Sequence, residues 1–227
     1  MSILRIARLG HPVLRRVAEP LPPERLDDPE ILRLFDDMIE TVRESEGAGL
    51  AAPQVHVPLR IVVLNTDPAG GPLVIVNPEI SFLDNHLLRS FEGCLSVPDL
   101  RAAVNRVGKV RVDGLDREGQ SLSLDLEGFS AIAVQHECDH LDGVLFLDRC
   151  DLRTLAFLDE LRRFGPLDPS FRRGGEPVGG GAPGGGDATP EESPPEPAPD
   201  TPPAEAAGAA AWSSPPLLLG RGSPAEG

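Results

Sequence analysis

The residues best suited to chemistry lie in the run His136–His140, whose sequence is HECDH. Residues four apart in a helix lie on the same face, so His136 and His140 can bind one metal ion. Glu137 follows the first histidine and is placed to take a proton from metal-bound water. From composition alone, this pattern is expected in well under about one in twenty chains of this length. The structural alternative is a pair of histidines that satisfy hydrogen bonds in the core.

Two histidines do not complete a catalytic metal site, and the sequence leaves the third ligand open. The HExxHxxGxxH pattern of one zinc-protease class begins correctly with Gly143, but Phe146 occupies its third histidine position, which excludes that class. A thermolysin-like site would take a glutamate from a following helix, where Glu160 is available. Cys94, beside Gly93, is a soft donor that suits Zn²⁺ or Fe²⁺. A small buried cysteine is the alternative for Cys94.

A third segment, Gly47–Gln54 with the sequence GAGLAAPQ, is rich in small residues that let backbone approach a ligand closely. Gln54 adds two amide donors and one acceptor. The segment contains no basic residue and no Gly-Lys-Ser/Thr follows, so a phosphate loop is disfavoured. A tight turn leading into a strand is the alternative interpretation.

The elements that position these residues can be predicted from periodicity. Asp28 and Pro29 begin an amphipathic helix that should end before Gly47, and Gly128 precedes a second helix over 129–141. A third helix is predicted from Asp151 to residue 164. Short strands are predicted at 59–64, 73–76, 107–112 and 121–126. Because strands and helices are segregated, we expect an α+β fold with mainly antiparallel strands around a central metal-binding helix and a C-terminal helix.

Composition excludes several classes of protein. Acidic residues outnumber basic residues by 36 to 21, giving a net charge of −15, which argues against a protein that binds DNA or other nucleic acid and against a cationic membrane-surface protein. No apolar run approaches the ~18 to 20 residues of a membrane span, and the first residues do not resemble a signal peptide. The three cysteines form no disulfide framework, and Cys138 and Cys150 are interpreted as structural.

The composition changes sharply near residue 168. Residues 168–227 contain 13 Pro and 12 Gly and show no helical or strand periodicity. Such a segment buries too little apolar surface to offset its ordering entropy. We therefore predict one folded domain over 1–167 and a disordered, acidic tail over 168–227.

Together, three runs resemble the signature motifs of peptide deformylase. They are Gly47–Gln54, Glu92–Ser96 (EGCLS) and Gln135–His140 (QHECDH), in the family's order and spacing. The resemblance covers roughly residues 3–164 and does not extend to the tail. Ala48 departs from the family pattern, because many members carry a larger aliphatic residue there.

The resemblance implies a metal-dependent amide hydrolase. Deformylases remove the formyl group from the N-terminal formylmethionine of newly made polypeptides and release formate. Carried over, Cys94, His136 and His140 bind one divalent metal ion, and water fills the fourth position. An open fourth position is the catalytic rather than the structural arrangement. The family generally uses Fe²⁺, and members also work with Zn²⁺, Ni²⁺ or Co²⁺.

The resemblance also implies roles for neighbouring residues. Glu137 would move the proton from water to the leaving amine, while the Gln54 side chain and the Leu95 backbone N–H would stabilise the oxyanion. We expect the substrate to be bound by Ala48, Gly49, Gly93, Ile132 and Ala133. As isolated positions, Ile132 and Ala133 have ordinary core packing as their alternative.

One charge pair is expected to support the site. The resemblance places Glu92 and Arg106 where they can fix the turn that carries Cys94. An ordinary surface ion pair, worth under ~1 kcal/mol, is the alternative for this pair.

Two rival functions can be separated from deformylation. A zincin-type peptidase shares the histidine helix without needing Cys94, so it would keep its metal in a Cys94→Ala variant. A non-catalytic binding module would have lost the catalytic groups, whereas Glu137, Gln54 and all three ligands are present.

The substrate class predicts where the protein works. Formylmethionine initiation belongs to bacteria and organelles, and family-like sequence begins almost at once, so bacterial cytoplasm is expected. The implied partners are formylmethionyl nascent chains and the ribosome near its exit tunnel. Four arginines are candidate contacts to ribosomal RNA phosphates: Arg162, Arg163, Arg172 and Arg173.

Overall fold

The computed structural model describes residues 2–67 and 69–166, and in these residues two antiparallel sheets provide the framework. The larger sheet has the order β1-β2-β3-β6-β7 and the smaller has the order β4-β5-β8. Every pair of neighbouring strands is antiparallel. The strands are β1 (Gly49–Ala51), β2 (Ile61–Leu64), β3 (Leu73–Phe82), β4 (Leu87–Cys94), β5 (Val97–Val107), β6 (Lys109–Leu115), β7 (Ser121–Glu127) and β8 (Ala156–Phe157).

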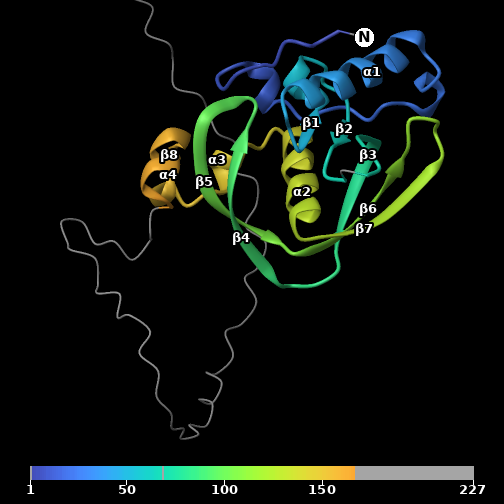
Figure 1. The fold of residues 1–227 in the computed structure, drawn as a ribbon. Helices are drawn as coiled ribbons and strands as arrows, with labels where there is room; N and C mark the ends of the chain where they lie inside the picture. The colour runs from blue at the N-terminus through green and yellow to red at the C-terminus, as the bar shows by residue number, and fades with distance from the viewer. Residues whose placement is uncertain (1, 68, 167–227) are drawn as a thin grey trace, which may run out of the picture. The chain divides into compact units, whose positions relative to one another are not determined.

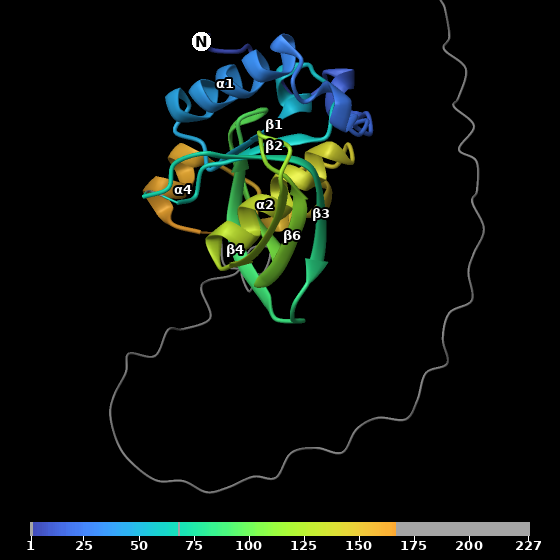
Figure 2. The same cartoon turned by 90° about the vertical axis from the view of Figure 1, so that its right-hand side faces the viewer.

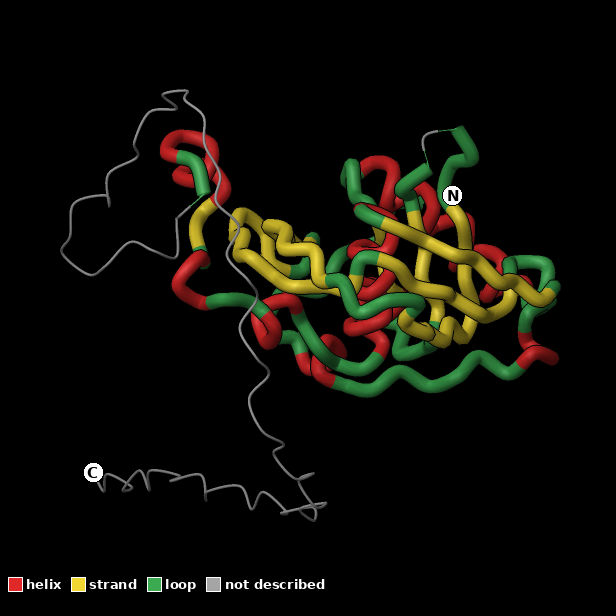
Figure 3. The backbone as a smooth tube through the Cα atoms, turned by 90° about the horizontal axis from the view of Figure 1, so that it is seen from below, coloured by secondary structure: helices red, strands yellow, loops and turns green. Residues whose placement is uncertain are grey.

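The helices of the described residues cover one end of this framework and fill its centre (Figure 1). The helix α2 packs against β1, β2 and β7 of the larger sheet and against β5 of the smaller one. Figure 3 shows the two sheets as separate yellow groups, while α1 lies across the top in Figures 1 and 2. The α-helices are α1 (Pro29–Glu44), α2 (Phe129–Leu141), α3 (Phe146–Arg149) and α4 (Leu158–Phe164).

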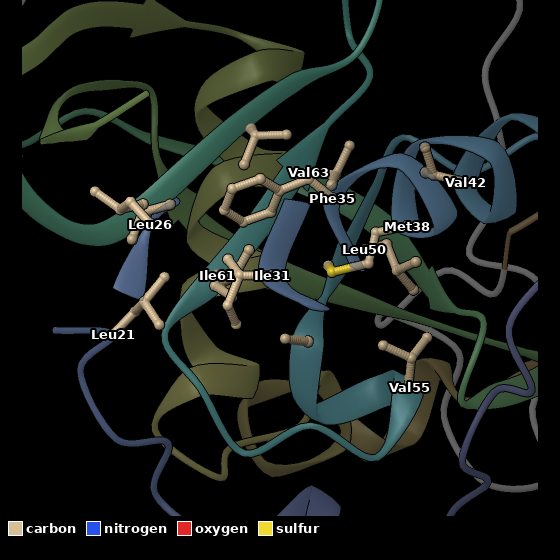
Figure 4. Close-up of a cluster of buried hydrophobic side chains, with 13 residues drawn as sticks. Leu21, Leu26, Ile31, Phe35, Met38, Val42, Leu50, Val55, Ile61 and Val63 are labelled. Atoms are coloured by element: carbon tan, nitrogen blue, oxygen red, sulfur yellow. The ribbon is translucent and has the colours of Figure 1, made fainter. Parts of the chain in front are cut away.

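The helix α1 is amphipathic, as its apolar periodicity predicts. Its buried side chains include Ile31, Phe35 and Met38, which pack with residues of β1, β2 and β3 in one hydrophobic cluster (Figure 4). The helix begins after Asp28 with Pro29 at its first position and ends before Gly47. The Asp28 side chain accepts a bond from Arg25 Nε (3.0 Å) and makes no cap bond to the helix.

The helix α2 has the predicted bounds and a different character from α1. Gly128 precedes it with φ of +60°, a left-handed conformation that favours glycine. Eleven of its thirteen residues are buried, and five of these are polar or charged: Gln135, His136, Glu137, Asp139 and His140. The polar groups of a helix that is buried on all sides need hydrogen-bond partners, and Gln135 finds one in the backbone of Val107.

The predicted helix from Asp151 to residue 164 is wrong over its first half. Residues Leu152–Thr154 form a 3-10 turn, β8 follows, and only Leu158–Phe164 is α-helical. Pairing of β8 with β5 displaces the helix, and Thr154 Oγ1 accepts a bond from Ala103 N of β5 (2.8 Å). Tertiary pairing has overridden local helix propensity here.

The predicted fold class is confirmed, but the predicted set of strands is incomplete. The α+β class and the antiparallel pairing are confirmed, and the four predicted strands correspond to β2, β3, β6 and β7. The hairpin of β4 and β5, which carries Cys94, was not predicted. The predicted tail over 168–227 lies outside the described residues. Within the described part of the chain, no helix is long and apolar enough to cross a membrane.

Candidate active site

Three metal-binding side chains meet where the end of β4 faces α2. Cys94 is the last residue of β4, and His136 and His140 lie one turn apart on α2. All three are buried, and their ligand atoms lie within 4.8 Å of one another, with Cys94 Sγ 3.2 Å from His140 Nε2. Bond lengths of about 2.3 Å to sulfur and about 2.0 Å to nitrogen put tetrahedral ligands about 3.5 Å apart. The three side chains can therefore share one ion.

The hydrogen bond of His136 fits the binding of a divalent transition metal, whereas His140 Nδ1 has no partner in the described structure. His136 Nδ1 is 2.9 Å from Glu92 Oε2, which leaves its Nε2 for a metal. Within residues 2–67 and 69–166, these three ligands form the one such group, and Glu160 is an exposed residue of α4 outside it. A thiolate with two imidazoles suits Zn²⁺ or Fe²⁺.

Glu92 and Arg106 form the expected charge pair, and the surface alternative is wrong. The side chains are only 5% and 4% exposed, and the guanidinium binds both carboxylate oxygens (2.8 and 2.9 Å). Burial alone raises the pKa of Glu92, but its bonds with Arg106 and His136 outweigh burial and lower that pKa to about 2. Glu92 is thus a carboxylate that orients His136.

The carboxyl group of Glu137 is buried and partly unsatisfied. Its Oε2 has no hydrogen-bond partner in the described structure, and the residue lines a pocket. Burial raises its pKa to about 7. A Cβ at residue 49 would lie 2.5 Å from Glu137 Oε1, so any larger residue there would displace the Glu137 side chain. A carboxyl group poised near neutral pH suits general acid–base chemistry.

Gln54 is held in the 3-10 turn Ala52–Val55 that follows β1. Its Oε1 accepts a bond from Ala51 N (2.8 Å), which fixes the amide plane. Its Nε2 donates to Ser96 Oγ (3.3 Å) and contacts Cys94 Sγ (3.5 Å). The amide N–H groups of Gln54 are therefore directed at the metal-binding cluster, and the Leu95 residue of the β4–β5 turn lies in the same pocket.

The pocket has a volume of about 360 Å³ and opens beside the metal-binding cluster. All five residues predicted to bind substrate line it: Ala48, Gly49, Gly93, Ile132 and Ala133. Phe91 and Arg101 also line it and were not predicted. The Arg101 guanidinium lies over Gly93, where any Cβ would overlap it. Only the register of the β4–β5 hairpin brings Arg101 to the pocket, so the sequence carries no local signal for it.

The other two cysteines lie outside the metal-binding group. Cys138 packs in the hydrophobic cluster of the larger sheet, and burial raises its thiol pKa to about 12. Cys150 contacts the cluster around Phe146 and bonds to Leu147 O. Both thiols are free.

Comparisons with known proteins agree with this geometry. Residues 3–155 match the family model of polypeptide deformylase. The peptide deformylase of Cellvibrio japonicus is 46% identical over 149 residues, which cover 65% of this chain and 86% of that protein. The Azotobacter vinelandii peptide deformylase is 47% identical over 149 residues, with 65% and 87% covered.

Solved structures give the same result. A class I type b peptide deformylase from Acinetobacter baumannii, bound to K1U, matches with a TM-score of 0.63 and 38% identity, covering 66% of this chain and all of that one. The Thermotoga maritima peptide deformylase has a TM-score of 0.62 and 37% identity, with 66% and 99% covered. The chain belongs to the polypeptide deformylase family.

Proposed function

We propose that Cys94, His136 and His140 hold one divalent metal ion and that Glu137 and Gln54 work beside it. The chain is a hydrolase that removes the N-formyl group from newly made polypeptides, as its family membership states. The observation that carries the residue roles is the meeting of three buried metal-binding atoms with the unsatisfied Glu137 carboxyl in one open pocket.

Fe²⁺ is the metal proposed, and Zn²⁺, Ni²⁺ and Co²⁺ are alternatives that the same ligands accept. A divalent metal held by these residues would lower the pKa of a water molecule and polarise the carbonyl that is attacked. The support for a metal is the donor set itself, in which Glu92 holds the His136 Nδ1 and leaves Nε2 free to bind.

Glu137 is proposed as the proton carrier of the reaction. Hydrolysis of a formamide must remove a proton from water and deliver one to the departing amine. Burial keeps the pKa of Glu137 near 7, so its carboxyl can accept a proton and return it near neutral pH. Its unsatisfied Oε2 faces no competing donor within the described structure.

Gln54 and Leu95 are proposed to stabilise negative charge on the formyl oxygen. The Gln54 carbonyl is occupied by Ala51 N, so its amide nitrogen, which donates to Ser96 Oγ and contacts Cys94 Sγ, is the end of the side chain that lies at the metal-binding cluster. The backbone N–H of Leu95 is the second proposed donor. Preorganised donors of this kind stabilise the transition state more than the substrate.

The apolar part of the pocket is proposed to hold the methionine side chain against Ile132, Ala133 and Ala48. The following residues would pair in extended form with the backbone near Ala48, which precedes β1, and at Gly93 of β4. The Acinetobacter baumannii relative has been solved with Met-Ala-Ser bound, which supports a peptide ligand for this pocket.

The cellular setting is proposed to be the bacterial cytoplasm, near the ribosome. The relatives reported above are bacterial proteins. Arg162 and Arg163 are exposed on α4 and are proposed to contact ribosomal RNA, whereas Arg172 and Arg173 lie outside the described residues. Co-sedimentation with ribosomes should weaken as salt rises. No co-sedimentation at low salt, or salt-independent co-sedimentation, would contradict this partner.

The residue roles can be tested with a matched pair of cysteine variants. Cys94→Ala should lose both bound metal and formate release from a formyl-Met-Ala peptide, and Cys150→Ala should keep both. Cys150 is a suitable control because it is also a free thiol but lies outside the ligand group. A Cys94→Ala protein that retains its metal would favour a peptidase-type site with another third ligand.

A further inference from the structure

A line of ionic hydrogen bonds leads away from the metal-binding cluster through the protein. It begins at His136, whose Nδ1 is 2.9 Å from Glu92 Oε2. The Arg106 guanidinium binds both Glu92 oxygens and also donates to Asp139 Oδ2 (2.6 Å). These carboxylate and guanidinium side chains are at most 10% exposed. Each one therefore depends on its neighbours in the line for its hydrogen bonds.

The line ends at Arg149, the last residue of α3. Arg149 donates from Nε to Asp139 Oδ2 and from its terminal nitrogen to Oδ1, both at 2.6 Å. Its side chain is 49% exposed, whereas that of Asp139 is 10% exposed. Asp139 Oδ2 thus receives one N–H from Arg106 and one from Arg149. The surface arginine fixes the plane of the buried carboxylate that Arg106 must meet.

The charges in this line balance only when Arg149 is present. Glu92 and Asp139 carry two negative charges, and Arg106 and Arg149 carry two positive charges. Without Arg149, one buried carboxylate charge would be uncompensated. Asp139 and Glu92 would then compete for the single guanidinium of Arg106, and the hold of Glu92 on His136 would loosen.

We propose that Arg149 is a positioning residue for the metal centre, although it does not line the pocket. It would fix Asp139 and, through Arg106 and Glu92, the orientation of the His136 imidazole. This inference rests on the proposed metal site. Groups that orient metal ligands from outside typically change metal affinity by about 10- to 100-fold when they are removed.

The chain contains a matched control for this arginine. Arg111 of β6 binds Asp125 of β7 through two bonds of 2.6 and 2.9 Å, and it is 46% exposed. Its partner is 56% exposed. Arg111→Met therefore removes an arginine of similar exposure that also makes a two-bond ion pair, with an exposed carboxylate that has no link to the metal-binding cluster.

The test compares Arg149→Met with Arg111→Met in the full chain. The Zn²⁺ affinity is measured by competition with a chelator, and the visible spectrum of the Co²⁺-loaded protein reports the ligand geometry. We expect Arg149→Met to bind Zn²⁺ at least about tenfold more weakly and to alter the Co²⁺ spectrum. Arg111→Met should match the unmodified chain. Arg149→Lys keeps the positive charge but cannot make the two parallel hydrogen bonds, so its Zn²⁺ affinity should lie between those of Arg149→Met and Arg111→Met.

Two results would overturn the inference. One is a Zn²⁺ affinity of Arg149→Met within about twofold of Arg111→Met. The other is a loss of affinity accompanied by an equal loss of metal-free stability, because that pattern indicates a merely structural residue. Metal uptake and formate release by the unmodified chain test the proposed function separately. An active, metal-binding chain with unchanged Arg149→Met affinity contradicts this inference alone.

Discussion

The helices α1 and α2 are similar in length but bury different kinds of side chain. In α1, six of sixteen residues are buried, and they form an apolar stripe against the larger sheet apart from Asp37 and Thr41. In α2, eleven of thirteen are buried, including two histidines and two carboxylates. The first helix gains stability by removing apolar surface from water, whereas the second must bring charged groups out of water.

The difference between the two helices indicates which residues stabilise the fold and which are proposed to carry out the reaction. Burial of ionisable groups is unfavourable unless they are paired, which explains the Glu92, Arg106 and Asp139 contacts around α2. Glu137 Oε2 and His140 Nδ1 are the exceptions on α2, because neither atom has a hydrogen-bond partner in the described structure. Substitutions in α1 should therefore act on folding, and substitutions at the unsatisfied groups near α2 should act on catalysis.

The largest effect is expected for Glu137→Gln. Removal of the proposed proton carrier should lower kcat/KM by about 10²–10⁴-fold. The free energy of unfolding should not fall, because a neutral amide is less costly to bury than a carboxylate. Formate release and chemical unfolding, measured on protein of equal metal content, check both halves. A Glu137→Gln protein that loses stability but retains kcat/KM would show that Glu137 supports the fold and not the reaction.

Phe35→Ala tests the other helix. Phe35 is fully buried in the cluster that α1 shares with the larger sheet, so its truncation should destabilise the protein by about 3–5 kcal/mol. The kcat/KM of the molecules that remain folded should be unchanged. Urea unfolding followed by assay below the transition measures both quantities. A large loss of kcat/KM in fully folded Phe35→Ala protein would show that α1 contributes to the site directly.

Gln54→Ala should depress kcat by about 10²–10³-fold with a smaller change in KM. The amide donors of Gln54 are proposed to act on charge that develops only in the transition state. Steady-state kinetics with a formyl-Met peptide separate the two parameters. A raised KM with kcat preserved would mean that Gln54 binds substrate and does not stabilise the oxyanion.

The smallest effect concerns Asp148, an exposed carboxylate of α3. The Arg15 guanidinium lowers its pKa below the ordinary 3.8. A lowered folded-state pKa contributes stability above pH 3.8, and this contribution is lost as pH falls through the folded value. Asp148→Asn should therefore lower the free energy of unfolding by under ~1 kcal/mol at pH about 6, which appears as a slightly lower Tm. The difference in Tm should vanish in acid. A Tm difference that grows as the pH falls would contradict this sign.

The parts of the molecule that local pattern determines were predictable. The apolar period of α1 and the Gly128 start of α2 gave both helices, and the HECDH run placed His136 and His140 together on α2. The run of small residues before Gln54 predicts a close backbone approach, and Gly49 lies against Glu137, a distant partner that the run itself does not identify. Residue types and spacing are sufficient wherever neighbours in sequence are neighbours in space.

The parts that depend on distant pairing were not predictable. Residues alone left Cys94 and Glu160 both open as third ligand, and the β4–β5 hairpin that brings Cys94 to α2 was missed. Strand β5 of the same hairpin pairs with β8, so the third helix is shorter in the structure than predicted. Arg149 lies ten residues from Asp139, and no periodicity signals their contact. Strand register and buried ion pairs are set by tertiary packing rather than by local propensity.

The central claim is that one metal ion at Cys94, His136 and His140 makes this chain active. Its most direct test is to strip the protein with a chelator and titrate Fe²⁺ back anaerobically, while formate release from a formyl-Met-Ala peptide is followed. We predict no activity in the stripped protein and a linear recovery that saturates at about one equivalent per chain. Formate release by the stripped protein, or recovery that needs a second equivalent, would contradict the claim.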